Sequence, residues 1–155
     1  MKINNTFAIG CIVQWYEIEI VEEYLESVKN AIDIIENKEN VIIDLYFNCS
    51  QELETVDEEQ KIISEIKHKY EDILERLFGD LEYGEYNIKS YMNEISNSMY
   101  TIADYRREFN DKYCTEVDVL MWGETDALLP QQTFQILDNL HTQVKDTTPK
   151  YITFF

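Results

Sequence analysis

The fold of this chain is decided by residues Phe7–Val13, FAIGCIV, a continuous run of apolar and partly β-branched side chains. Such a short run is typical of a strand that is buried on both faces of a parallel sheet. Apolar side chains then recur at steps of three and four from Val21 to Ile35, which predicts an amphipathic helix ending near Asn37. The stretch VIIDLYF, residues 41–47, predicts a second strand. We expect these segments to form a right-handed β-α-β unit.

The rest of the chain continues this alternation. Residues 52–85 carry 12 acidic and 4 basic side chains around an apolar stripe, which predicts a long acidic surface helix followed by a turn. Further segments follow in order: a strand at 85–92, a helix with Met99, Ile102, Ala103, Arg106 and Phe109 on one face, a strand at 117–122, a last helix after Pro130, and a short strand at Tyr151–Phe155. The sequence therefore predicts one α/β domain over residues 1–155, with a mostly parallel, doubly wound, Rossmann-like sheet.

Composition narrows the classes of partner. The formal net charge is -18, from 31 acidic and 13 basic side chains, and this disfavours binding to nucleic acid or to an anionic membrane. No apolar run approaches the ~20 residues that span a bilayer, and the first residues do not match an export signal, so we expect a cytoplasmic protein. Cys11, Cys49 and Cys114 are widely spaced, which favours reduced thiols over a disulfide framework or a zinc site.

Ligands of open α/β sheets bind outside the carboxyl ends of the strands. Glu124 and Asp126 stand two residues apart directly after a strand that we predict to be buried. Their carboxylates could converge on a hard divalent cation such as Mn²⁺ or Mg²⁺. Taken alone, the same pattern also fits a turn that caps the helix after Pro130.

Several stretches in order along the chain extend this interpretation: Phe7–Tyr16 (FAIGCIVQWY), Tyr24–Val28 (YLESV), Asn48–Ser50 (NCS), Ala103–Asn110 (ADYRREFN) and Asp118–Pro130 (DVLMWGETDALLP). Together they resemble the nucleotide-binding half of a GT-A glycosyltransferase, most similar to family 2, and the last two stretches are the specific ones. The resemblance implies a metal-dependent enzyme that takes a nucleotide-diphosphate sugar as donor and transfers the sugar to an acceptor hydroxyl. It also implies that Glu124 and Asp126 are the metal ligands, in the place of the family's Asp-x-Asp motif.

The nucleotide-binding residues expected from this resemblance come from three stretches: Gln14, Tyr16, Asn48, Ser50, and one or both of Arg106 and Arg107. Each has a structural alternative. Gln14 and Tyr16 could cap a turn, Asn48 and Ser50 could form an Asx-type turn, and the two arginines could be an exposed surface pair.

The chain also departs from the family pattern. Glu124 replaces the first aspartate of the motif, Asn48 stands where family members often carry an aspartate, and family enzymes continue beyond the position of Phe155 with the acceptor site and the catalytic base. We therefore expect nucleotide binding and catalysis to separate, with a base supplied by a partner or by a second copy. The first residues to test for an overlooked base are Asp104, Asp118 and His141.

Two other function classes stay open at this point. One is a catalytically silent nucleotide-binding or interaction module that has kept the fold, because fold alone does not settle activity. The other is a structural or inhibitory protein whose acidic surface mimics a polyanion. Neither the nucleotide, the sugar nor the acceptor follows from the sequence.

Overall fold

The computed structural model describes residues 1–49, 56–93 and 100–144, and of residues 56–63 it describes the backbone only. Its strands are β1 (Phe7–Gln14), β2 (Val41–Asn48), β3 (Asn87–Asn93) and β4 (Val119–Trp122). Its helices are α1 (Val21–Asp33), α2 (Val56–Phe78), α3 (Ile102–Tyr113) and α4 (Thr133–Val144), with 3-10 turns η1 (Trp15–Glu17) and η2 (Lys38–Asn40). The four strands form one parallel sheet in the order β3-β2-β1-β4.

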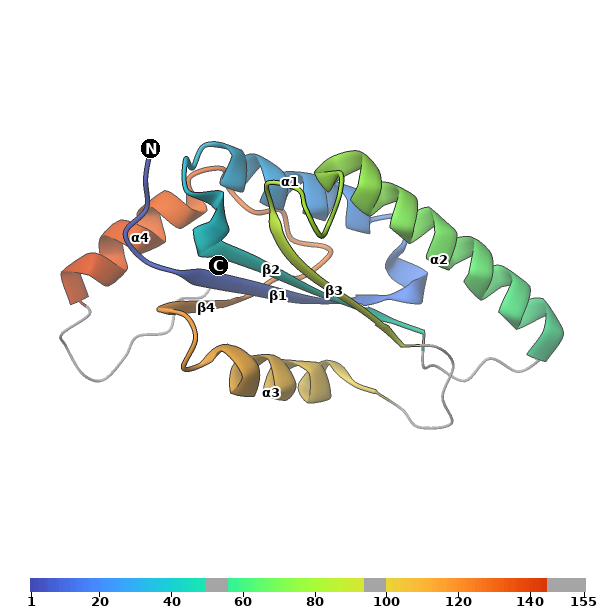
Figure 1. Ribbon diagram of the computed structural model, residues 1–155. Coiled ribbons are helices and arrows are strands. Elements are labelled where there is room, and N and C mark those ends of the chain that lie inside the picture. The colour runs from blue at the N-terminus through green and yellow to red at the C-terminus, as the bar shows by residue number, and fades with distance from the viewer. Residues whose placement is uncertain (50–55, 94–99, 145–155) are drawn as a thin grey trace.

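Helices cover both faces of this sheet. Helices α1, α2 and α4 lie on one face, and α3 lies on the other (Figure 1). The chain runs outward from β1 through β2 to β3, and then crosses back to place β4 on the other side of β1. This confirms the predicted doubly wound, Rossmann-like α/β fold, and it puts the topological switch point between β1 and β4.

The sheet is organised around β1, in which all eight residues are buried as the sequence predicts. On the face of α3, Ala8 and Ile12 pack with the aromatic side chains of that helix. Gly10 makes this packing close, because a Cβ there would lie 2.5 Å from a ring carbon of Phe109. The missing side chain lets α3 lie directly on the central strand.

Two predicted faces differ from the structure. Phe109 of the predicted α3 face is buried as expected, but its buried partners are Tyr105 and Tyr113, whereas Ile102 is 46% exposed. The face with aromatic side chains at steps of four packs on the sheet because its large rings bury more apolar surface than Ile102 and Ala103 would. Met99 of the predicted face lies outside the described residues.

Strand β4 was predicted to be buried, but its side chains are half-buried and Trp122 is 52% exposed. The reason is that β4 pairs with β1 alone in the described sheet and forms its edge.

Helix α1 ends at Asp33 rather than near Asn37. The side-chain amide of Asn37 instead bonds the backbone of Ile3, accepting from its N–H and donating to its carbonyl. The predicted strand at 151–155 lies outside the described residues.

Helix α2 occupies the acidic segment of the sequence. It packs through Tyr70, Ile73 and Leu74, while the acidic side chains between them, such as Glu71 and Asp72, are exposed. Gly79 ends the helix with a φ of 69°. In the part of the chain that the structure describes, no helix is both long and apolar enough to cross a membrane.

Candidate functional site

A pocket of about 190 Å³ lies at the switch point, between β1, the residues that follow β4, and the first turns of α3. Its polar lining consists of Glu17, Arg106, Glu124, Thr125 and Asp126. The fold thus brings Arg106 together with both predicted metal ligands. This is the place where doubly wound sheets bind their ligands.

Arg106 is held at the pocket by two contacts. Its Nη2 donates a hydrogen bond of 2.8 Å to Oε1 of Glu124, and its guanidinium lies over the ring of Trp122, 4.7 Å from the centroid. The indole Nε1–H of Trp122 in turn donates to Oδ1 of Asn110 on α3, at 3.0 Å. The arginine of α3 is therefore held by β4 and by the residue Glu124 that follows it, and Trp122 is itself bonded to α3.

Glu17 is a pocket residue that the sequence analysis did not identify. One carboxylate oxygen accepts a 2.8 Å hydrogen bond from the backbone N–H of Gln14, and the other accepts from the hydroxyl of Thr125. Glu17 thereby links the turn after β1 to the loop that carries Glu124 and Asp126. The spacing from Gln14 to Glu17 is that of a capping box, and this was the available signal.

Gln14 and Asn48 lie together, but in an amide network and not in the lining of the pocket. The Nδ2 group of Asn48 donates to Oε1 of Gln14 at 2.9 Å and to the carbonyl of Tyr100 at 3.0 Å. Its Oδ1 accepts from Nδ2 of Asn93 at 2.7 Å. Asn48 is fully buried, and the network joins the ends of three neighbouring strands, β1, β2 and β3, which is a structural role other than the Asx-type turn considered from the sequence.

The other predicted nucleotide-binding residues are dispersed. Tyr16 follows β1 and is 56% exposed, in edge contact with Trp15, and Ser50 lies outside the described residues. The side chain of Arg107 is 71% exposed and lies 3.8 Å from Asp104, so it pairs within α3 and does not line the pocket. Of the two arginines, the pocket contains Arg106 alone.

The titratable groups singled out as candidate bases have other partners. Asp104 accepts hydrogen bonds from the backbone N–H and hydroxyl of Thr101 and so caps the start of α3. Asp118 accepts from the backbone N–H of Thr6 at 2.9 Å and from its hydroxyl at 3.1 Å. His141 is half-buried on α4, on the face of the sheet opposite to α3 (Figure 1).

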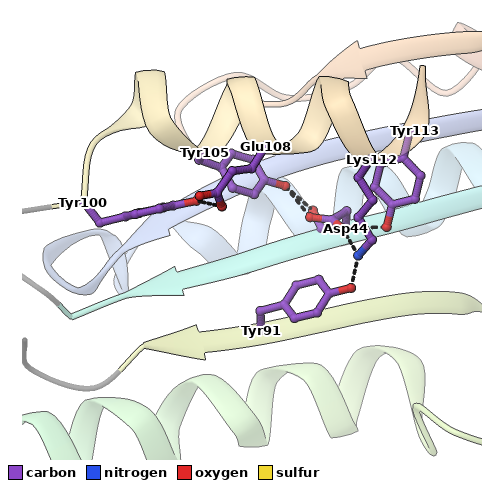
Figure 2. Close-up of polar contacts among 7 residues, drawn as sticks. All are labelled: Asp44, Tyr91, Tyr100, Tyr105, Glu108, Lys112 and Tyr113. Atoms are coloured by element: carbon purple, nitrogen blue, oxygen red, sulfur yellow. Dashed lines mark hydrogen bonds and ion pairs between the residues drawn. The ribbon is translucent and has the colours of Figure 1, made fainter. Parts of the chain in front are cut away.

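A second polar cluster lies under α3, around Asp44 in the middle of β2 (Figure 2). The Asp44 carboxylate is 3% exposed and accepts hydrogen bonds from the hydroxyls of Tyr105 at 2.5 Å and Tyr113 at 2.7 Å. The ammonium of Lys112 lies 3.7 Å from Oδ2 of Asp44 and also donates to the hydroxyl of Tyr91. The signal in the sequence is one acidic residue, Asp44, within the otherwise apolar strand VIIDLYF.

Electrostatics keeps the phenols of Tyr105 and Tyr113, which donate to Asp44, in their protonated form. Burial, followed by the negative charge of Asp44, raises the pKa of Tyr105 far above its usual range. Burial and the hydrogen bond to Asp44 raise the pKa of Tyr113 in the same direction. Because Tyr105 also lines the pocket beside Arg106, the cluster anchors α3 at the pocket.

The donor set of the pocket suits a cation that is shared with a ligand. Among the described residues, no group of three or more His, Cys, Asp or Glu side chains could hold a metal ion. Glu124 and Asp126 nevertheless line one pocket, and Mg²⁺-type sites commonly use one or two carboxylates plus water and phosphate oxygens. Glu124 is paired with the guanidinium of Arg106 at 2.8 Å. Of the residues present, Glu124 and Asp126 are the ones that could hold a divalent cation at this pocket.

The parallel sheet and its switch-point pocket define a Rossmann-like α/β protein. Among solved structures, the chain is similar to S. aureus TarS 1-349, a glycosyltransferase, with a TM-score of 0.53 and 12% sequence identity. The match covers 89% of this chain and 32% of the TarS chain, and at this identity it establishes likeness of fold. No protein-family model and no curated protein matches the sequence.

Proposed function

We propose that this chain binds a nucleotide-diphosphate sugar through a divalent cation and serves an enzyme that transfers the sugar to an acceptor hydroxyl. The observation that carries the proposal is the meeting of Arg106, Glu124 and Asp126 in one pocket at the switch point. The likeness of the fold to the glycosyltransferase TarS supports the same reaction class. Because the match covers only 32% of the TarS chain, the activity of the whole TarS protein does not carry over, and the transfer step is part of the proposal.

Each charged pocket residue has a role in this proposal. Glu124 and Asp126 hold Mn²⁺ or Mg²⁺, whose chemistry when bound is to offset negative charge on the nucleoside diphosphate as it leaves. Arg106 donates hydrogen bonds to phosphate oxygens, which its planar guanidinium matches in geometry. Glu17 keeps the loop of Glu124 in place through Thr125. Arg107, which does not line the pocket, is left out of the proposed site.

The nucleoside would lie toward the carboxyl ends of β1 and β2, beyond the pocket. Tyr16 is exposed there and can stack on a base, whereas Gln14 and Asn48 support the surface through their amide network. Ser50 remains a sequence-based prediction for this region. Neither the base nor the sugar follows from these residues.

Donor binding without transfer is the second candidate function, and one observation favours it. None of the carboxylates that line the described pocket is left to act as the base. Glu17 accepts hydrogen bonds through both oxygens, and Glu124 and Asp126 are the proposed metal ligands. A base for the acceptor hydroxyl would then come from outside the described pocket lining, for example from a partner or from a second copy of the chain.

Calorimetric titration with UDP-, GDP- and CDP-sugars, each with and without Mn²⁺, tests the proposal. We expect one nucleotide class to bind, with an affinity that falls when Mn²⁺ is removed by a chelator. Binding accompanied by transfer to an acceptor would support the enzyme, and binding without transfer would support the silent module. Absence of binding to all three donors would favour the acidic structural or inhibitory protein instead.

A further inference from the structure

We infer that Arg106 is a built-in counter-cation of the metal site. Its guanidinium pairs with Glu124 until a cation and a diphosphate arrive together, and it then moves from the carboxylate to the phosphate. This inference rests on the proposed function. It adds that the cation and the nucleotide bind synergistically, and that one side chain of the protein produces the synergy.

The first observation is the charge of the pocket. Three carboxylates line it, those of Glu17, Glu124 and Asp126, in a chain with a formal net charge of -18. Among the described lining residues, Arg106 is the only basic side chain. Without a bound cation, its guanidinium is the group that offsets the repulsion between these carboxylates.

The second observation is that the ion pair is both well placed and easily exchanged. The 2.8 Å bond from Arg106 to Glu124 joins side chains that are 31% and 59% exposed, and exposed pairs of this kind are weak. The Trp122 ring, 4.7 Å from the guanidinium carbon, provides a second support that does not depend on the carboxylate. Arg106 can therefore release Glu124 and remain at the pocket.

These two observations together make the order of binding matter. A divalent cation that arrives alone must displace the guanidinium from Glu124, and it then shares the pocket with an unpaired positive charge. When the cation arrives with a diphosphate, the phosphate oxygens accept the hydrogen bonds that Glu124 gives up. The cation and the nucleotide then each raise the affinity for the other by the same factor.

The test compares two variants that remove the same charge from neighbouring positions. Arg106→Gln keeps a side chain over Trp122 without the charge, and Arg107→Gln is the matched control because Arg107 is 71% exposed and outside the pocket. Binding of Mn²⁺ alone is followed by electron paramagnetic resonance, without nucleotide. Binding of the preferred Mn²⁺–nucleotide complex is measured by calorimetry.

We expect Arg106→Gln to change the two affinities in opposite directions. Affinity for Mn²⁺ alone should rise about threefold to fivefold, because no ion pair has to be broken. Affinity for the Mn²⁺–nucleotide complex should fall about tenfold, because a charge-assisted hydrogen bond to phosphate is lost. Arg107→Gln should change either affinity by less than about twofold.

A ligand-independent readout accompanies these titrations. The indole N–H resonance of Trp122 should shift in Arg106→Gln, because the guanidinium over the ring is gone, and it should stay in place in Arg107→Gln.

Three outcomes would overturn the inference: unchanged Mn²⁺ affinity in Arg106→Gln, an equal rise in both variants, or no Mn²⁺ binding by either the wild type or Arg106→Gln. A further outcome separates the two ideas. If Arg106→Gln binds Mn²⁺ more tightly but the protein binds none of the three nucleotide sugars, the role of Arg106 as counter-cation is supported and the proposed function is refuted. The two ideas are thus tested separately.

Discussion

The carboxylate of Asp138 on α4 accepts a 2.8 Å hydrogen bond from the backbone N–H of Asn5, which precedes β1 and lies 133 residues away along the chain. The same carboxylate also accepts from the side-chain amide of Asn5 at 2.8 Å and from the backbone N–H of Asn4 at 2.9 Å. Asp138 is 1% exposed, so these three donors take the place of water around a buried charge. They tie α4 to the start of the central strand.

Replacing Asp138 by Ala should destabilise the fold strongly. The buried donors of Asn5 and the partly buried N–H of Asn4 would lose their acceptor, and we expect the free energy of unfolding to fall by about 2–4 kcal/mol. Urea denaturation measures this change. Asn139→Ala, at the exposed neighbouring position, is the control and should cost less than about 0.5 kcal/mol. Equal losses in the two variants would show that Asp138 is not the tether.

Removing the hydroxyls that face Asp44 should reveal coupling within that cluster. Tyr105→Phe and Tyr113→Phe should each lower the free energy of unfolding by about 1–2 kcal/mol, because each takes a donor from a buried carboxylate. The double variant should depart from the sum by about 0.5 kcal/mol or more, since both donors serve one acceptor. Tyr83→Phe, at a side chain that is 82% exposed, is the control for loss of a phenol. Strict additivity would argue against a shared anchor.

The stability contributed by Asp33 should depend on pH. Partial burial tends to raise the pKa of this carboxyl, but the hydrogen bonds from Lys29 and Tyr86 and the charges of Lys29 and Lys38 outweigh it, so the folded-state pKa lies below the ordinary value of 3.8. The stabilisation is therefore present above that value and is lost as the pH falls through the lowered pKa. Asp33→Asn should cost about 1 kcal/mol at neutral pH. Urea denaturation across the acid range should show this difference from wild type shrinking, and a constant difference would contradict the assignment.

Replacing Glu124 and Asp126 together by Ala should abolish Mn²⁺-dependent nucleotide binding, because both proposed metal ligands are lost. Both side chains are exposed, so the free energy of unfolding should change by less than about 0.5 kcal/mol. Calorimetry and urea denaturation measure the two effects. A double variant of Asp72 and Glu75, which are exposed on α2, removes the same charge and should keep nucleotide binding. Full affinity in the first variant would reject these ligands.

Much of the fold could be predicted because its central strands carry a strong local signal. FAIGCIV is buried along its whole length, and a strand of that kind is uniformly apolar in sequence. Parallel connections are right-handed, so the helices after β1 and β2 had to lie on one face of the sheet. The burial of the edge strand was harder to predict. VLMW is as apolar as a central strand, but β4 has only one neighbouring strand in the described sheet and is therefore half-buried.

The site could be predicted only in part, because its contacts join distant segments. Glu124 and Asp126 were found from their spacing and their position after a strand. Asp44 was missed because its donors, Tyr105 and Tyr113, lie 61 and 69 residues further along the chain. A single acid in an apolar strand does not show which helix will cover it.

The central position of β1 also bears on how the chain is made. β1 pairs with β2 on one side and with β4 on the other, and the residue before it, Thr6, meets Asp118 across 112 residues of chain. At a synthesis rate of about 5–20 residues per second, one edge of this first strand waits roughly 5 to 20 seconds for its partner to leave the ribosome. During that time the backbone N–H and C=O groups along that edge are open to chaperones and to other nascent chains. The most buried strand of the finished sheet is therefore the one that the growing polypeptide leaves incomplete the longest.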